Sequence, residues 1–306
     1  MKGQISNLSQ VAYIRRYILS DGKEEGIRVV EVNNGNIRFM LNECKALDVM
    51  QLWHKGDNIS FISKNGFTKR ETLFSGRFEG GMLYTVGLDS AGVREGFETH
   101  GSFHNIPAKI ISLVCNDEKI EVVAEIEDTA LFGRNLKIER KIVTEINGDT
   151  VTLHDTVINN GTKDENFCVL YHVNVGYPML DEGVEVLYDG QTVVPRTALA
   201  KERIGEIHGF LKPVDNQEER CYFIENREPL FKVVNKKINK TFTLKYSKDT
   251  LPKTVLWQSN ATGDYALGLE PTTTFLDDKF AYSVLEKGKN KQFKIAISVY
   301  NSTENK

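Results

Sequence analysis

Residues 136–161 read LKIERKIVTEINGDTVTLHDTVINNG. Apolar and polar side chains largely alternate over 136–146 and again over 150–158, the period-two pattern of strands with one buried face. Asn147-Gly148 separates the two runs, and a second Asn-Gly turn follows them. Asn and Gly accept the positive φ angles that two-residue hairpin turns require. This stretch therefore predicts a β-hairpin followed by another turn.

The same pattern extends outward along the chain. Residues 27–33 and 37–41 flank Asn34-Gly35-Asn36 and predict a second hairpin. Further runs typical of strands are 119–128, 241–246, 253–259, 265–270 and 292–300. Strands at a spacing of roughly 8–15 residues favour a sandwich or barrel over an α/β fold. Helical periodicity is sparse, and residues 41–53 and 5–19 are the best helical candidates.

The organisation of the chain follows from its length and uniformity. A chain of 306 residues is near the upper limit for one hydrophobic core. No repeat, low-complexity tract or linker divides it. We expect a single all-β domain over residues 1–306, with the strands and short helix of residues 1–60 packed on it.

Composition and charge restrict the kind of protein. The fractions of hydrophobic residues, 40%, and charged residues, 26%, are those of a folded globule. A net charge of -3 gives no electrostatic reason to expect nucleic acid or an anionic membrane as partner. No stretch approaches the roughly 20 apolar residues of a membrane span, and the N-terminus lacks a signal-peptide core. We expect a cytoplasmic protein, either a monomer or a homodimer.

The cysteines give no sign of a structural metal site. Cys44, Cys115, Cys168 and Cys221 are widely scattered, and no CxxC pair occurs. Zinc sites of the usual spacing need such pairs. We expect reduced, mostly buried thiols.

Two histidines lie in an unusual segment, Glu98-Thr-His-Gly-Ser-Phe-His-Asn-Ile-Pro-Ala. It follows the glycine-rich residues 80–92, and glycines permit the close backbone approaches of a ligand-lined loop. The spacing of His100 and His104 would place both rings on one face of a helix, as for a metal. Gly101 and Pro107 argue against a helix here, so a metal pair is only weakly indicated.

Polar residues also interrupt two apolar strands. His172 and Asn174 lie two residues apart in VLYHVNVGYP and therefore share one face. Buried polar groups need partners, so these side chains are either satisfied in the core or part of a site. Glu270 ends the run Tyr265-Ala-Leu-Gly-Leu, and its same-face neighbours, Ala266 and Gly268, leave room for a ligand. A desolvated carboxyl of raised pKa suits a general base near neutral pH.

At these residues the chain resembles the galactose mutarotase-like superfamily, in a bacterial branch of aldose 1-epimerase-like proteins. Three blocks carry the resemblance, in the same chain order: HGSFHNIPA from His100, LYHVNVGYP from Leu170 and LGLEP from Leu267. The resemblance implies a β-supersandwich with its site on the concave face. The chain departs from the well-studied mutarotases at Ser102 and Tyr171, and their sugar-holding aspartate has no clear counterpart.

The resemblance also implies roles for individual residues. His172 is the general acid, Glu270 is the general base and His100 binds the sugar. Arg77 contacts sugar hydroxyls, and His104 is a further substrate-binding candidate. Beside these, Asn174, Gln258 and Trp257 would orient hydroxyls and offer an apolar stacking face.

The expected function is that of an aldose 1-epimerase, which interconverts the α and β anomers of a free sugar by acid and base catalysis. No nucleotide-binding motif occurs in the chain, and we expect no cofactor and no metal. One alternative is a sugar-binding protein without catalysis. Another is a metal-dependent sugar isomerase using His100, His104, His172 and Glu270, and a third is a purely structural sandwich.

Overall fold

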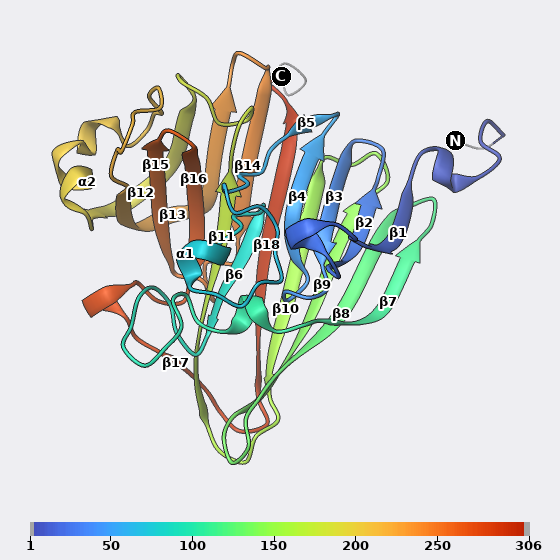
Figure 1. The fold of residues 1–306 in the computed structure, drawn as a ribbon, viewed down its shortest axis with the longest axis horizontal. Coiled ribbons are helices and arrows are strands. Elements are labelled where there is room, and N and C mark those ends of the chain that lie inside the picture. Colours follow the sequence, from blue (N-terminus) through green and yellow to red (C-terminus); the bar gives the residue numbers. More distant parts are fainter. Residues whose placement is uncertain (1–2, 303–306) are drawn as a thin grey trace.

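The computed structural model describes residues 3–302. Their strands form two antiparallel sheets (Figure 1). The N-terminal sheet has the order β1-β2-β3-β4-β5. The large sheet has 13 strands in the order β17-β11-β16-β15-β13-β14-β18-β10-β9-β8-β7, with β12 added on β13 and β6 on β11. The expectation of an all-β fold is confirmed.

The elements have the following bounds. The N-terminal sheet contains β1 (Tyr13–Ile18), β2 (Arg28–Asn33), β3 (Ile37–Asn42), β4 (Asp48–His54) and β5 (Asp57–Asn58). The large sheet contains β6 (Leu83–Leu88), β7 (Lys109–Cys115), β8 (Lys119–Thr129), β9 (Asn135–Glu145), β10 (Thr150–Asn159), β11 (Glu165–Val175), β12 (Glu185–Pro195), β13 (Arg220–Asn235), β14 (Lys240–Tyr246), β15 (Lys253–Ala261), β16 (Asp264–Thr272), β17 (Ser283–Leu285) and β18 (Asn290–Asn301). The short helices are α1 (Phe74–Arg77) and α2 (Ala198–Glu202). Neither α-helix in residues 3–302 has the length and apolar character that a bilayer span requires.

The hairpins predicted from Asn-Gly turns are present. β9 pairs with β10 around Asn147-Gly148, with Thr144 opposite Val151. Asn147 has φ +57°, the left-handed conformation that Asn tolerates. β2 pairs with β3 around the turn at residues 34–36. Figure 1 shows the long strands β8, β9 and β10 side by side.

The two helix predictions are wrong. Residues 41–53 contain the end of β3, a turn and most of β4, and residues 5–19 contain β1 after one 3-10 turn. Ala46 and Leu47 make the turn in the left-handed region, at φ +48° and +57°. Burying these apolar residues between two sheets outweighs their helix propensity, which is a weak local preference.

Successive residues of the central strands face two different environments. On β11, Val169, Tyr171 and Val173 belong to the main core, which the N-terminal sheet also lines. Cys168 and Leu170 face the opposite side and join a separate apolar cluster. His172 lies on this second side by the period of two. The strand therefore separates the main core from a second, polar-lined face.

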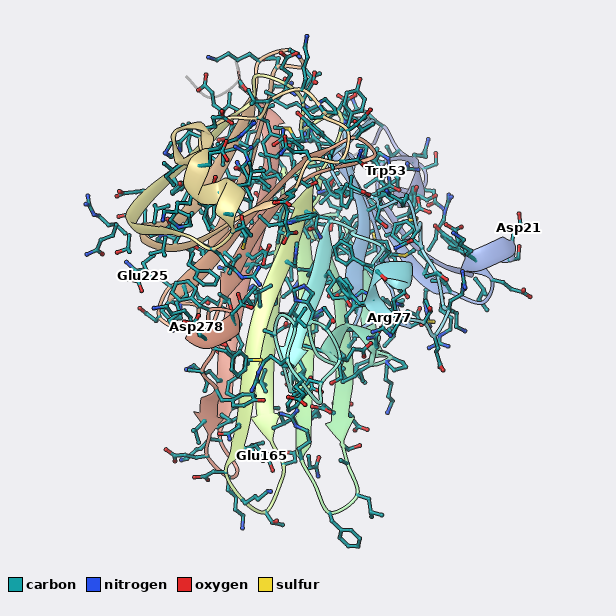
Figure 2. The ribbon with its side chains drawn as sticks, turned by 60° about the vertical axis from the view of Figure 1, so that its left-hand side comes forward. Asp21, Trp53, Arg77, Glu165, Glu225 and Asp278 are labelled. Atoms are coloured by element: carbon teal, nitrogen blue, oxygen red, sulfur yellow. The ribbon has the colours of Figure 1, made fainter. Side chains whose placement is uncertain are left out.

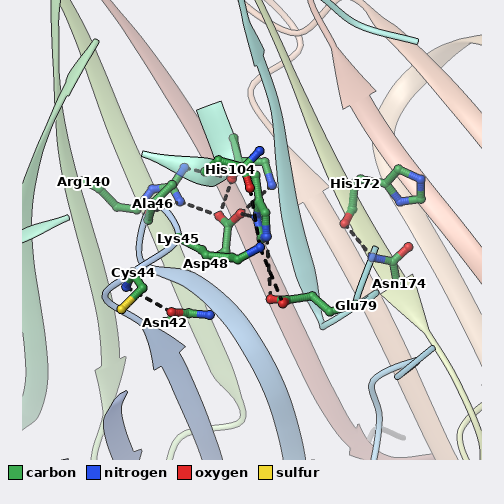
Figure 3. A network of polar contacts seen from close by, with 12 residues as sticks. Asn42, Cys44, Lys45, Ala46, Asp48, Glu79, His104, Arg140, His172 and Asn174 are labelled. Carbon is green, nitrogen blue, oxygen red and sulfur yellow. Dashed lines mark hydrogen bonds and ion pairs between the residues drawn. The ribbon is translucent and has the colours of Figure 1, made fainter. Parts of the chain in front are cut away.

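A buried ionic cluster joins the two sheets (Figure 3). The Arg140 guanidinium on β9 donates two hydrogen bonds to the Asp155 carboxylate, at 2.7 and 2.9 Å. It also donates to Asp48 Oδ1 and to the Ala46 carbonyl in the N-terminal sheet, at 2.6 and 2.7 Å. The remaining donor reaches Thr85 Oγ1 at 3.0 Å. All five N–H groups of Arg140 therefore have acceptors, although the side chain is fully buried.

The cysteines are free thiols, but they are not mostly buried as expected. Cys168 and Cys221 are buried, whereas Cys44 and Cys115 are partly exposed.

Candidate functional site

A cavity of about 560 Å³ opens on the second face of the large sheet. Such a volume suits a small-molecule site. Strands β11, β13, β15 and β16 form its floor, and the segment before β6, which includes α1, covers one side. The lining side chains that matter for function are His100, His172, Arg196, Glu219, Cys221, Trp257 and Glu270, with Phe61, Phe74 and Phe78 as apolar walls.

His172 and Glu270 meet at the floor of this cavity. Leu170 pairs with Thr272, and Val173 with Leu269, so His172 on β11 lies across from Glu270 on β16. His172 Nε2 is 3.2 Å from Glu270 Oε1, and the two side chains are 7% and 2% exposed. His172 Nδ1 is buried without a hydrogen-bond partner. A buried polar atom without a partner, beside an open cavity, is available to a ligand.

His100 reaches the same place from a loop. It has φ +66°, and the following Gly101 has φ +75°. A Cβ on Gly101 would lie 2.4 Å from the Gly87 carbonyl oxygen, so only glycine fits the tight turn that presents His100. The ring centroids of His100 and His172 are 5.9 Å apart, and Phe74 packs on His100 at 5.1 Å.

The surroundings favour uncharged forms of all three groups. Burial, helped by the charge of Arg196, lowers the pKa of His100 to about 4. Burial and the neighbouring His100 lower the pKa of His172 to about 3. Burial, together with the charge of Glu219, raises the pKa of Glu270 well above its usual value, against the opposing effect of Arg196. Near pH 7 both imidazoles are therefore neutral, and burial favours the protonated form of the Glu270 carboxyl.

Trp257 also lines the cavity, as one wall beside His172. Its ring packs edge-on against His172, with centroids 5.6 Å apart. Its indole Nε1 donates to Glu219 Oε2 at 2.7 Å. Glu219 and Arg196 are cavity residues that sequence reasoning missed. Arg196 directly follows one strand and Glu219 directly precedes the next, both among other polar residues. Neither interrupts an apolar run, so the sequence pattern does not distinguish them from surface residues.

Four predicted site residues lie outside the cavity lining: His104, Arg77, Asn174 and Gln258. His104 packs below it, stacked on Tyr84 at 3.7 Å, with Nδ1 2.7 Å from Asp48 Oδ2 in the buried ionic cluster. Arg77 at the end of α1 forms an ion pair with Glu98. Figure 3 shows His104 well apart from His172. The four ligands of the metal-dependent alternative therefore do not converge on one point.

Asn174 and Gln258 are buried away from the opening. The Asn174 amide donates to the carbonyl of His172 at 3.0 Å, and the segment around Phe61 covers it. Gln258 follows Trp257 on β15 and therefore faces the opposite side of the sheet. Its amide donates to the Ile207 carbonyl at 3.0 Å. Within residues 3–302, no group of three or more His, Cys, Asp or Glu side chains has the geometry to hold a metal ion.

Gly268 makes the contact between His172 and Glu270 sterically possible. A Cβ at this position would lie 2.7 Å from Glu270 Oε1, 3.0 Å from His172 Cε1 and 3.1 Å from Trp257 Cβ. We expect Gly268→Ala to push these groups apart. A displacement of about 1 Å can reduce catalysis about 10²-fold, and we predict a loss of this size in the activity proposed below.

Gly205→Ala is the matched control, because a Cβ there meets nothing within 4 Å. Both variants should retain the wild-type circular dichroism spectrum. Unchanged activity in Gly268→Ala would show that the close approach of the two side chains is not required.

The fold is shared with sugar-related proteins of known structure. A candidate aldose 1-epimerase from Klebsiella pneumoniae superposes with a TM-score of 0.85, at 19% identity over 95% of this chain and 84% of that chain. A galactose mutarotase-like protein from Clostridium acetobutylicum gives a TM-score of 0.69, at 12% identity over 95% of this chain and 99% of that chain. A candidate mutarotase from Salmonella typhimurium gives 0.69, at 13% identity over 97% and 96%. The chain therefore has the galactose mutarotase-like β-sandwich fold, as the sequence predicts.

A comparison of the sequence with protein-family models identifies the family of this chain. Residues 24–299 match DUF4432, a domain of unknown function, and the chain belongs to that family. No curated protein matches the chain.

Proposed function

We propose that this protein is an aldose 1-epimerase, which interconverts the α and β anomers of a free sugar. The observation that carries the proposal is the buried pair of His172 and Glu270, 3.2 Å apart at the floor of an open cavity. His100 and the face of Trp257 beside this pair suit a polyhydroxylated ring with one apolar side. Structures of the same fold from proteins described as candidate aldose 1-epimerases support the choice of sugar chemistry.

Mutarotation needs one proton to be taken from the O1 hydroxyl and one to be given to the ring oxygen. The pair of His172 and Glu270 holds the single proton required. Burial favours the form in which Glu270 holds this proton, and transfer of the proton to His172 produces a carboxylate and an imidazolium side by side. Glu270 then accepts the O1 proton while His172 donates to the ring oxygen. The C1–O5 bond breaks, C1 rotates, and the reverse transfers close the ring on the other face.

The remaining cavity residues would position the sugar. His100 is close enough to His172 to hold a hydroxyl near the reacting carbon. Glu219, fixed by the indole of Trp257, has a second carboxylate oxygen available to accept from sugar hydroxyls. Glu219 would thus hold sugar hydroxyls, the role of the aspartate in the well-studied mutarotases that has no clear counterpart in this sequence.

The test is anomer exchange measured by NMR on α-glucose, α-galactose and other free aldoses. We expect the purified protein to accelerate exchange of at least one sugar, and we expect the rate to be unchanged after treatment with a chelator. Saturable sugar binding without acceleration would instead establish a sugar-binding protein. Loss of activity with the chelator would establish the metal-dependent alternative.

A further inference from the structure

The cavity lining contains a positive charge, the guanidinium of Arg196, together with the candidate catalytic groups and the paired Lys64. Arg196 follows β12, and its side chain is 25% exposed. Its charge lowers the pKa of His100 and opposes the raised pKa of Glu270, so it lies within electrostatic reach of both. A guanidinium in this place would ordinarily be a binding group for a carboxylate or phosphate.

That guanidinium already forms an ion pair with a carboxylate of the same chain, Asp277. Asp277 belongs to the 3-10 turn of residues 277–279, which follows β16 at the rim of the cavity. Arg196 Nε donates to Asp277 Oδ2, and Nη2 donates to Oδ1 at 2.8 Å. This fork uses two of the five donors of Arg196. Asp277 has φ +57°, a left-handed conformation that Asp and Asn adopt more readily than most residues.

The other charged residues around the cavity also disfavour the binding of a negatively charged ligand. Glu219 bonds to the indole of Trp257. No ion pair joins Glu219 to a cation within the described residues 3–302. Lys64 pairs with Asp264 at 2.7 Å, and both side chains are exposed. Apart from Glu270, whose protonated form burial favours, the cavity lining therefore presents one charge without a counter-ion, the negative carboxylate of Glu219.

We propose that Asp277 determines the charge of the sugar that this site accepts. As a built-in counter-ion, it neutralises Arg196, whose free N–H groups then donate to the hydroxyl oxygens of an uncharged sugar. An acidic sugar such as a uronic acid would have to displace Asp277 from Arg196 and also face Glu219. This inference rests on the proposed sugar-binding function, and it adds a specificity-determining residue to it.

The test compares two sugar pairs that differ in the charge at C6: glucose with glucuronate, and galactose with galacturonate. Binding is followed by the fluorescence of Trp257 in a Trp53→Phe background, which leaves Trp257 as the single indole of the chain. Figure 2 shows Trp53 far from Asp278 in the rim turn, so the background substitution lies away from the site. Anomer exchange by NMR is measured on the same samples.

Asp277→Asn keeps the size of the side chain and tolerates the same backbone conformation, but it removes the counter-ion. We expect the ratio of uronate affinity to neutral-sugar affinity to rise at least tenfold in this variant. Asp278→Asn, in the same turn and without a contact to Arg196, should leave the ratio unchanged. Adding Arg196→Gln to Asp277→Asn should abolish the gain.

Three results would overturn the inference: equal binding of uronates and neutral sugars by the wild type, an unchanged ratio in Asp277→Asn, or no binding of any of the four sugars by either protein. A shifted binding ratio without accelerated anomer exchange would keep the specificity inference and reject the epimerase. Accelerated exchange with an unchanged ratio would do the reverse.

Discussion

Glu270→Gln is expected to reduce the acceleration of anomer exchange by about 10²–10⁴-fold, the usual contribution of a positioned proton-transfer group. Glutamine has nearly the same shape as a protonated glutamic acid, so it fits the buried position beside His172. An amide cannot hold and release the proton that the pair must exchange with the sugar. The measurement is NMR exchange spectroscopy of the best substrate, with wild type and variant at equal concentration.

Two controls make this result specific. Sugar binding, read from Trp257 fluorescence, should change little in Glu270→Gln, because the side chain still fills its place on β16. Glu225→Gln, an exposed residue on β13, should exchange anomers at the wild-type rate. If Glu270→Gln equals the wild type in rate, Glu270 is not the base and the proposed mechanism is wrong.

Arg140→Met is expected to lower the free energy of unfolding by about 3–5 kcal/mol, the typical effect of removing one partner from a buried ion pair. The substitution leaves the carboxylates of Asp48 and Asp155 buried without the guanidinium that now satisfies them. It also removes the hydrogen bonds that tie the Ala46 turn of the N-terminal sheet to β9. The measurement is equilibrium unfolding in urea with linear extrapolation.

Arg227→Met is the matched control. The Arg227 side chain is 65% exposed, and its ion pair with Asp189 is long, with 3.7 Å between Nη1 and Oδ1. An exposed substitution of this kind should change stability by less than about 0.5 kcal/mol. Arg140→Lys keeps a charge but cannot form the two-pronged contact with Asp155, so it should fall between the two. Equal stabilities of Arg140→Met and Arg227→Met would show that the buried cluster does not hold the sheets together.

On regular strands the sequence predicted the face of the sheet that a polar side chain occupies, but not whether the cavity reaches it, since Asn174 and Gln258 lie outside the lining. His172 and Glu270 stand out because each is polar in an apolar strand, and the period of two assigns each to a face. The structure places both on the same face of neighbouring strands. The same rule separates Trp257 from Gln258, since adjacent residues on one strand point to opposite sides. Only Trp257 lines the cavity.

Loop residues and charged residues were harder to predict. His104 lies four residues after His100, yet it packs into the buried cluster with Asp48 instead of the cavity. That partner is on β4, far away in sequence, and nothing near His104 indicates the contact. Arg196 and Glu219 reach the cavity because β13 pairs with β15 and β12 pairs with β13 in the sheet. A contact of this kind depends on strand order, which local patterns do not contain.

By itself, the sequence determined that this protein is built of antiparallel strands joined by tight Asn-Gly turns, and that a few polar residues interrupt its apolar strands. These features are local, because alternation and positive φ angles are properties of short segments. Only the tertiary structure decided that residues 41–53 form a turn and a strand, and which charges surround His172 and Glu270. Both depend on the packing of segments far apart in the chain, where burial and pairing energies exceed local preferences.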